Sequence, residues 1–212
     1  DARADRVPFC VRQCRELADR QPGLVAGQQH ADRGAAGGDT LGDAGLGVVG
    51  SLFMEAGVDD ADYQAEARHV ASEVGRHGIL GQIASCRPER PESFEAWLDE
   101  CADLKVHGLR RILHVVPDEV SQSDGFRANL RKIGKRGWTF DMCYLARQLP
   151  IAADLARACP DQALVLDHCG VPDIAGGAFA PWAEGIMALA KLPNVMVKLS
   201  GIAAYCTPGT VT

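Results

Sequence analysis

The sequence predicts an α/β fold with a mostly parallel sheet, and three observations support this. Six short apolar, β-branched runs recur roughly every 25 to 30 residues. Each run is followed by a helical pattern or a loop, a repetition that is typical of parallel sheets. A β/α barrel and an open doubly wound sheet both fit this repetition, but no G-x-G-x-x-G follows the first run, which disfavours a dinucleotide-binding sheet.

The expected elements alternate along the chain. The six strand-like runs cover residues 48–55, 79–84, 109–116, 138–143, 163–168 and 195–199. Five segments between them combine helix formers with apolar residues three and four positions apart, at residues 60–77, 91–104, 125–136, 149–160 and 180–192. Gly, Pro and Asn punctuate the joins, so each expected element has its own boundary.

The first 45 residues differ from the rest of the chain. Residues 1–45 are rich in Arg, Ala, Asp and Gly, and their large apolar residues show no sustained period. Such a composition predicts an irregular leader that is partly disordered. A leader read out of frame is an alternative explanation. We therefore divide the chain into this leader and a barrel domain over residues 46–212.

Composition excludes several classes of function. The chain has 212 residues and a formal net charge of -6, which argues against a nucleic-acid partner. No apolar run is long enough for a membrane span, and the N-terminus has no signal-peptide core. None of the eight cysteines forms a C-x-x-C pair. These features predict reduced thiols and a cytoplasmic location.

Polar residues stand near the carboxyl ends of the expected strands. They are Glu55, Ser85, His114, Asp141, His168 and Lys198. In a β/α barrel these ends converge on one face and build the active site, so this placement favours the barrel.

His168 is the strongest catalytic candidate. An imidazole at a strand end can transfer a proton near neutral pH or bind a metal, whereas a buried, hydrogen-bonded structural histidine is the alternative. Asp167 precedes it in the run LVLDHCGVPDI. If the strand continues regularly through both residues, their side chains lie on opposite faces, and Asp167 packs away from the pocket or orients a neighbour.

Other strand residues are candidates for substrate binding. One of Arg110 and Arg111 is expected to point inward as an anion clamp, and Arg111 is our choice; a salt bridge to a helix is the alternative. Lys198 can hold a carboxylate or an oxyanion, or form an ion pair at the barrel mouth. The remaining candidates are His114, Asp141 and Ser200. Cys143 is interpreted as a packing residue rather than a nucleophile.

Five motifs together resemble the amidohydrolase-related family. They are FMEAGVDDADYQAEA, GLRRILHVV, GWTFDMCYLARQLP, LVLDHCGVPDI and LPNVMVKLSGI, in order between about Gly47 and Tyr205. The resemblance is to the branch of metal-dependent hydrolases that includes L-fuconolactonase and 2-pyrone-4,6-dicarboxylate lactonase. It implies a TIM (β/α)8 barrel that hydrolyses a small lactone, ester or amide by water attack.

The resemblance also implies roles for particular residues. His168 matches the family's later-strand histidine, a catalytic residue and metal ligand, and Asp167 belongs to the same motif. Lys198 and Ser200 match a later strand end. A divalent metal such as zinc is implied, although lactonases of this branch also work without one. The implied partner is a small carboxylated or sugar lactone.

The chain departs from the family pattern in two places. It contains no His-x-His motif for the first strand, and it ends at Thr212 before the last strand and its aspartate. The six runs then correspond to about strands 2–7 of a partial barrel, whose open edges would favour oligomers. The predicted function is a lactonase-like hydrolase; the alternatives are a catalytically inactive barrel fragment and a small-molecule binding module.

Overall fold

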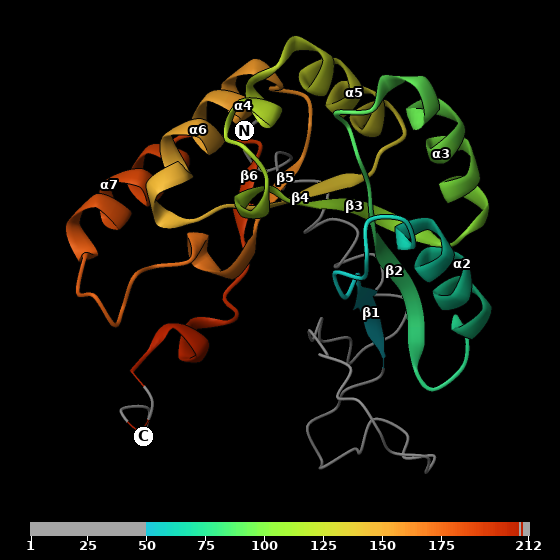
Figure 1. The fold of residues 1–212 in the computed structure, drawn as a ribbon, viewed down its shortest axis with the longest axis horizontal. Helices are drawn as coiled ribbons and strands as arrows, with labels where there is room; N and C mark the ends of the chain where they lie inside the picture. Colours follow the sequence, from blue (N-terminus) through green and yellow to red (C-terminus); the bar gives the residue numbers. More distant parts are fainter. Residues whose placement is uncertain (1–49, 208, 210–212) are drawn as a thin grey trace, which may run out of the picture. The chain divides into compact units, whose positions relative to one another are not determined.

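The computed structural model describes residues 50–207 and Gly209 (Figure 1). The expectations for the leader at residues 1–45 lie outside the described residues, and the proposed boundary at residue 46 stays a prediction.

All six predicted strands are present. They are β1 (Ser51–Met54), β2 (Ile79–Ser85), β3 (Val106–Ile112), β4 (Thr139–Cys143), β5 (Leu164–Leu166) and β6 (Val195–Val197). Two of their boundaries differ from the predicted ones in a way that matters for the site. β3 ends at Ile112 because Leu113–Val115 turns into a 3-10 helix, and β5 ends at Leu166 because Asp167–Gly170 does the same.

The strands follow one another in the sheet in the order of the sequence, β1-β2-β3-β4-β5-β6. The pairs β1–β2, β4–β5 and β5–β6 are parallel. A doubly wound sheet reverses its strand order at a switch point, whereas a β/α barrel adds each strand beside the preceding one. The sequential order therefore confirms the predicted fold class, with six strands arranged as part of a (β/α)8 barrel.

The five predicted helices are also present. They are α2 (Tyr63–Glu73), α3 (Pro91–Asp103), α5 (Asp124–Lys135), α6 (Leu149–Ala158) and α7 (Phe179–Leu189). One further short helix, α4 (Glu119–Gln122), precedes α5 and was not predicted. Its four residues span about one turn, too short for a helical period to show in the sequence.

The chain forms two compact units that divide both α3 and β3. Unit 1 contains residues 1–86 and 97–108, and its described core lies between α2, β2 and the end of α3. The rings of Tyr63 and Trp97 meet edge to face, with centroids 5.5 Å apart. The buried Gln82 amide donates to the carbonyls of Ala67 and Leu104 at 2.9 and 2.8 Å, so β2 is tied to α2 and to the segment before β3.

Unit 2 contains residues 87–96 and 109–212, and here α5 packs on β4. Ser123 caps α5 by accepting a hydrogen bond from the Phe126 amide. The Phe126 ring then meets Phe140 of β4 edge to face at 6.0 Å. Because side chains alternate along a strand, Phe140 and Met142 face the helices and Asp141 faces the opposite side of the sheet. This sidedness positions the candidate site.

Helices α6 and α7 lie side by side in unit 2 (Figure 1). The six cysteines in the described part of the chain form no disulfide, and five of them are buried. Among residues 50–207, no helix is both long and apolar enough to cross a membrane.

Candidate active site

The candidate site lies at the carboxyl ends of β4, β5 and β6. Asp141 of β4 pairs in register with Val165 of β5, which in turn pairs with Met196 of β6. Neighbouring residues of parallel strands place their side chains on the same face, and so do residues two positions further along. Asp167 and Lys198 follow directly after β5 and β6, and their side chains meet Asp141 on the side away from the helices, as the ion pairs of Lys198 with both carboxylates show.

Four charged side chains form a cluster on this face. Arg110 Nε of β3 lies 2.6 Å from Asp167 Oδ2, with side-chain exposures of 8% and 1%. Lys198 Nζ lies 3.1 Å from Asp167 Oδ1 and donates a hydrogen bond to Asp141. Two cations thus balance two carboxylates. We call Arg110, Asp141, Asp167 and Lys198 the charge cluster.

The pKa values of Asp141 and Lys198 in the charge cluster are both raised. Burial raises the pKa of Asp141 to about 6, with Lys198 opposing the shift and Asp167 adding to it. Burial alone would lower the pKa of Lys198, but the two carboxylates outweigh it and raise that pKa. Lys198 is therefore a fixed cation at neutral pH, whereas Asp141 gains a proton in mildly acidic solution.

The segment Asp167–Gly170 is a tight turn rather than the end of a strand. His168 and Cys169 have positive φ angles of 52° and 56°, and Gly170 and Val171 continue the left-handed path. Non-glycine residues adopt this conformation rarely and at an energetic cost. The turn is held to the next strand by the Cys169 amide, which donates to the Lys198 carbonyl at 3.0 Å.

The turn corrects the expected relation between Asp167 and His168. That expectation required a regular strand through both residues, but β5 ends at Leu166, so alternation stops before Asp167. Asp167 does not pack away from the site. It is buried in the charge cluster, and the left-handed turn carries the half-buried His168 beside it.

His168 contacts the end of β6. Its Nδ1 lies 3.0 Å from Ser200 Oγ, a hydrogen bond whose donor depends on the tautomer. Gly201 packs so closely that a Cβ there would lie 2.8 Å from the same nitrogen. The imidazole is thus held in one orientation by a hydroxyl and by close backbone packing, as a proton-transfer group or a ligand requires.

Cys143, Asp167 and His168 form a group that could hold a metal ion. The Cys143 sulfur, a carboxylate oxygen of Asp167 and a ring nitrogen of His168 all lie within 4.8 Å of one another. Asp167 Oδ1 is buried and accepts no well-formed hydrogen bond, although Lys198 lies within ion-pair distance. A thiolate, a carboxylate and an imidazole suit zinc, and three protein ligands leave a position open for water or substrate. The residues therefore fit the implied metal.

A cavity of about 440 Å³ lies next to this turn. Val171, Pro172 and Asp173 form one side of it, and Tyr205 contributes to its lining. Burial raises the pKa of Tyr205, with Cys143, Asp167 and Cys169 adding to the shift. The phenol therefore stays protonated at neutral pH. The volume is sufficient for a small ligand.

Comparison with known families decides the assignment. The family model described as Amidohydrolase matches residues 26–210. The chain is an amidohydrolase family member. The match begins ahead of the domain boundary that we expected at residue 46.

Several relatives support the lactonase branch. An L-fucono-1,5-lactonase of Burkholderia ambifaria is 40% identical over 101 residues, which are 47% of this chain and 35% of the relative. An L-fucono-1,5-lactonase of Burkholderia multivorans is 27% identical over 168 residues, which are 74% of this chain and 53% of the relative. The amidohydrolase chain therefore spans about half the length of the Burkholderia multivorans relative and about a third of the Burkholderia ambifaria relative.

Solved structures confirm the fold. A crystal structure of an amidohydrolase from Burkholderia multivorans with bound HEPES is 23% identical, with a TM-score of 0.68 over 76% of this chain and 57% of that chain. A second crystal form with bound zinc is 24% identical, with a TM-score of 0.66 and the same coverage. At these identities the likeness establishes the barrel fold of the amidohydrolase chain.

The structure gathers most of the predicted site residues of this amidohydrolase in unit 2. Asp141, Asp167 and Lys198 meet in the charge cluster, and His168 contacts Ser200 beside it. His114 is half-buried, and its Nδ1 lies 3.3 Å from the Cys143 carbonyl. Glu55 and Ser85 are buried in unit 1. The substrate-binding roles predicted for His114, Asp141, Lys198 and Ser200 stay predictions.

The two arginines of β3 have different partners. Arg110 pairs with Asp167, whereas Arg111 Nε lies 3.0 Å from Glu89 Oε1 in the loop after β2. Alternation along the strand showed that only one of them could face the site, but it did not show which one. Our choice of Arg111 as substrate-binding stays a prediction, and Arg110 is the one that the charge cluster contains.

Two further residues of the site were not predicted from the sequence. Cys143 was interpreted as a packing residue, yet its sulfur lies with the ligand atoms of Asp167 and His168. Its position two residues after Asp141 on the same strand placed it on the same face, a signal that could have been used. Tyr205 lies in a short 3-10 turn after β6 and has no motif of its own.

Proposed function

We propose that this chain carries the His168 half of a lactonase active site. The observation that carries the proposal is the left-handed turn after β5, which places His168 beside Asp167 of the charge cluster and leads directly into Val171 and Pro172 of the cavity lining. Membership in the amidohydrolase family and the L-fucono-1,5-lactonase relatives support it. The substrate is then a small sugar lactone or a carboxylated lactone.

The proposed reaction is hydrolysis by water. Water attacks the lactone carbonyl, the ring C–O bond breaks, and the products are a carboxylate and a hydroxyl on one molecule, with one proton released to the solvent. His168 would accept a proton from the attacking water and return it to the leaving ring oxygen. Lys198 is the cation proposed to hold the developing oxyanion or a substrate carboxylate, because its charge persists at neutral pH.

Zinc is the metal proposed for this site. Cys143, Asp167 and His168 would hold it, and a bound zinc ion would supply Lewis acidity and lower the pKa of a coordinated water. Ligation and proton transfer are different roles for His168. Assays with and without added zinc separate them, because a proton-transfer role needs no metal.

A substrate assay tests the proposal. The purified chain is incubated with L-fucono-1,5-lactone or 2-pyrone-4,6-dicarboxylate, with and without zinc, and hydrolysis is followed by acid release. The His168→Ala variant should lose turnover. His69→Ala is the matched control, because His69 is exposed on α2 of unit 1 and its removal should leave the rate unchanged. Turnover that survives in His168→Ala would refute the proposed role.

The same assay distinguishes the other interpretations. Binding of a lactone without turnover would favour a small-molecule binding module, and neither binding nor turnover would favour an inactive fragment. The comparisons give no support to the inactive alternative. Association through open barrel edges and a cytoplasmic location stay predictions.

A further inference from the structure

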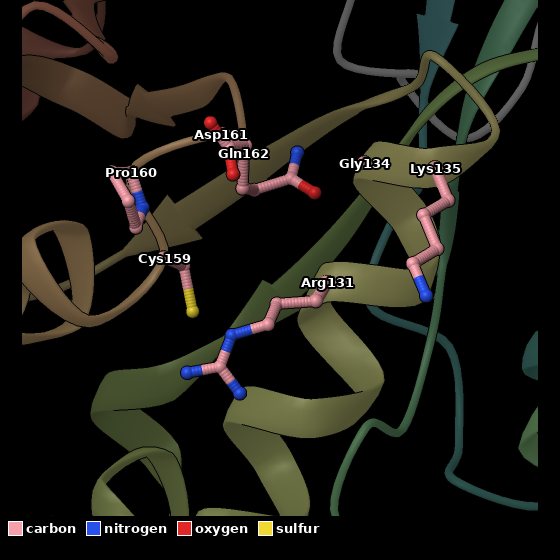
Figure 2. Close-up of a pocket in the computed structure, with 7 residues that line it drawn as sticks. All are labelled: Arg131, Gly134, Lys135, Cys159, Pro160, Asp161 and Gln162. Atoms are coloured by element: carbon pink, nitrogen blue, oxygen red, sulfur yellow. The ribbon is translucent and has the colours of Figure 1, made fainter.

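A second cavity lies in unit 2 at the other end of β5. Its volume is about 220 Å³, and its walls are the last turns of α5 and the segment between α6 and β5 (Figure 2). The residues that line it are Arg131, Gly134, Lys135, Cys159, Pro160, Asp161 and Gln162. The cavity precedes β5, whereas His168 follows it, so this cavity is separate from the candidate active site.

Gln162 brings an unsatisfied acceptor to this cavity. Its side chain is buried, with 1% exposure, and its Nε2 donates to the carbonyls of Trp138 and Ala163 at 2.9 and 2.8 Å. These two acceptors fix the orientation of the amide, so that Oε1 points the other way. No described residue donates to Oε1. Buried polar atoms are nearly always paired, so this oxygen indicates a missing donor.

The Gln162 side-chain oxygen packs closely against Gly134 of α5. Figure 2 shows the Gln162 side chain extending toward the turn of α5 that holds Gly134. A Cβ at Gly134 would lie 2.9 Å from the buried Gln162 Oε1, so a side chain at position 134 would crowd this side of the oxygen and the glycine does not. A ligand donor would have to reach the oxygen from the cavity that both residues line.

The cavity carries a net positive charge. Arg131 and Lys135 lie four residues apart on the same face of α5, and Asp161 is the one carboxylate in the lining. Arg131 Nη2 donates to the Ala158 carbonyl at 2.9 Å, which holds the guanidinium at the cavity. Cys159 is a buried thiol whose pKa burial raises, so it adds no negative charge at neutral pH.

We propose that this cavity is a second binding site, for a small hydroxycarboxylate. The carboxylate would pair with Arg131 and Lys135, and a hydroxyl would donate to Gln162 Oε1. Asp161 at the rim can accept from a second hydroxyl. Lactone hydrolysis yields a molecule of this class, with a carboxylate and a hydroxyl together. A role for the cavity in product feedback rests on the proposed function, whereas the binding site itself does not.

Three six-carbon probes test the ligand class. Gluconate has a carboxylate and hydroxyls, hexanoate has only the carboxylate, and sorbitol has only hydroxyls. Binding is followed on the full chain by calorimetry and by the ¹⁵N shifts of the Gly134 amide and the Gln162 side-chain amide. Gluconate should bind and move both signals, and hexanoate and sorbitol should bind at least about tenfold more weakly, because each lacks one of the two charge or hydrogen-bond contacts.

Two substitutions test the place of binding. Lys135→Gln should weaken gluconate binding about tenfold through the loss of a charge-assisted hydrogen bond. Lys191→Gln is the matched control, because Lys191 is exposed and does not line this cavity. His168→Ala should leave gluconate affinity at the Gln162 signal unchanged. This last variant separates the two sites, so a chain without lactonase activity can still bind gluconate here.

Other results would overturn the proposal. They are an absence of gluconate binding, equal binding of hexanoate, or an affinity that His168→Ala changes and Lys135→Gln does not. In each case the unpaired Gln162 oxygen would be satisfied by water alone.

Discussion

Removal of the Asp167 charge should destabilise the fold strongly. In the charge cluster, Asp167 and Arg110 are 1% and 8% exposed, and Lys198 also contacts Asp167. Asp167→Asn would leave the buried Arg110 and the partly exposed Lys198 with Asp141 as the one remaining carboxylate of the cluster. Loss of one partner from a buried ion pair costs about 3–5 kcal/mol, because the other charge stays desolvated. The lower end is expected here, since the asparagine oxygen can still accept from Arg110.

The charge balance supplies a repair that tests this explanation. Arg110→Met in the Asp167→Asn background removes the surplus cation and leaves Asp141 paired with Lys198. The double variant should therefore be more stable than Asp167→Asn alone, since an ion pair replaced at both positions is often close to neutral. A loss in the double variant equal to the sum of the two single losses would refute the reasoning.

Urea denaturation followed by circular dichroism measures these changes at pH 7.5. A loss of about 3 kcal/mol is large against a usual stability of about 5–15 kcal/mol, so the midpoint should shift clearly. Glu100→Gln is the control, because Glu100 pairs with Arg68 in an ion pair whose side chains are 35% and 51% exposed. That pair is screened by solvent, and its loss should not change the midpoint measurably.

Three further predictions concern the same region. Burial raises the pKa of Asp141 from 3.8 to about 6, so the folded chain binds this proton more tightly than the unfolded chain and its stability falls as pH rises between these values. Asp141→Asn should remove about 2 kcal/mol of pH dependence between pH 4 and pH 7, and urea midpoints at these two pH values measure it. Gly170→Ala places a Cβ 2.7 Å from Leu149 at a φ of 71°, so it should cost more stability than the about 1–2 kcal/mol of a left-handed backbone alone. Gly177→Ala is the control, because Gly177 has a φ of 70° but no atom near its Cβ position, and it should cost only about that backbone amount. An equal loss of stability in both variants would contradict the packing argument. Cys143→Ser should weaken zinc binding at least about tenfold in a competition titration with a chelator if the sulfur is a ligand, and an unchanged affinity would remove Cys143 from the set.

The fold was predictable because its signal is repeated. Each strand and helix has its own apolar period and its own Gly or Pro boundary, so an error at one boundary does not change the fold class. The sequence could not show that β5 would stop at Leu166, because LVLDH is a continuous strand pattern. The turn after it depends on contacts with β6, such as the Cys169 amide on the Lys198 carbonyl, which lies 29 residues further along the chain.

The candidate site was predictable residue by residue but not in its pairings. The position of His168, Asp141 and Lys198 near strand ends was enough to predict that they lie at the same end of the sheet. Which arginine of β3 would join them depends on the register of that strand, and the predicted start at residue 109 differed from the actual start at Val106. A pattern within one short segment of sequence does not determine which side chains pair between strands.

The charge cluster explains why the turn after β5 tolerates its strain. Left-handed φ angles at His168 and Cys169 each cost about 1–2 kcal/mol. The Val171 amide closes the turn on the His168 carbonyl at 2.9 Å, and contacts outside the turn add to this bond. Asp167 anchors the start of the turn through Arg110 and Lys198, and Ser200 contacts the imidazole that results. The neutral cluster therefore stabilises the backbone that presents His168. His168 and the charge cluster therefore depend on each other structurally. A substitution of Asp167 should disturb the orientation of the His168 ring as well as the stability of the fold.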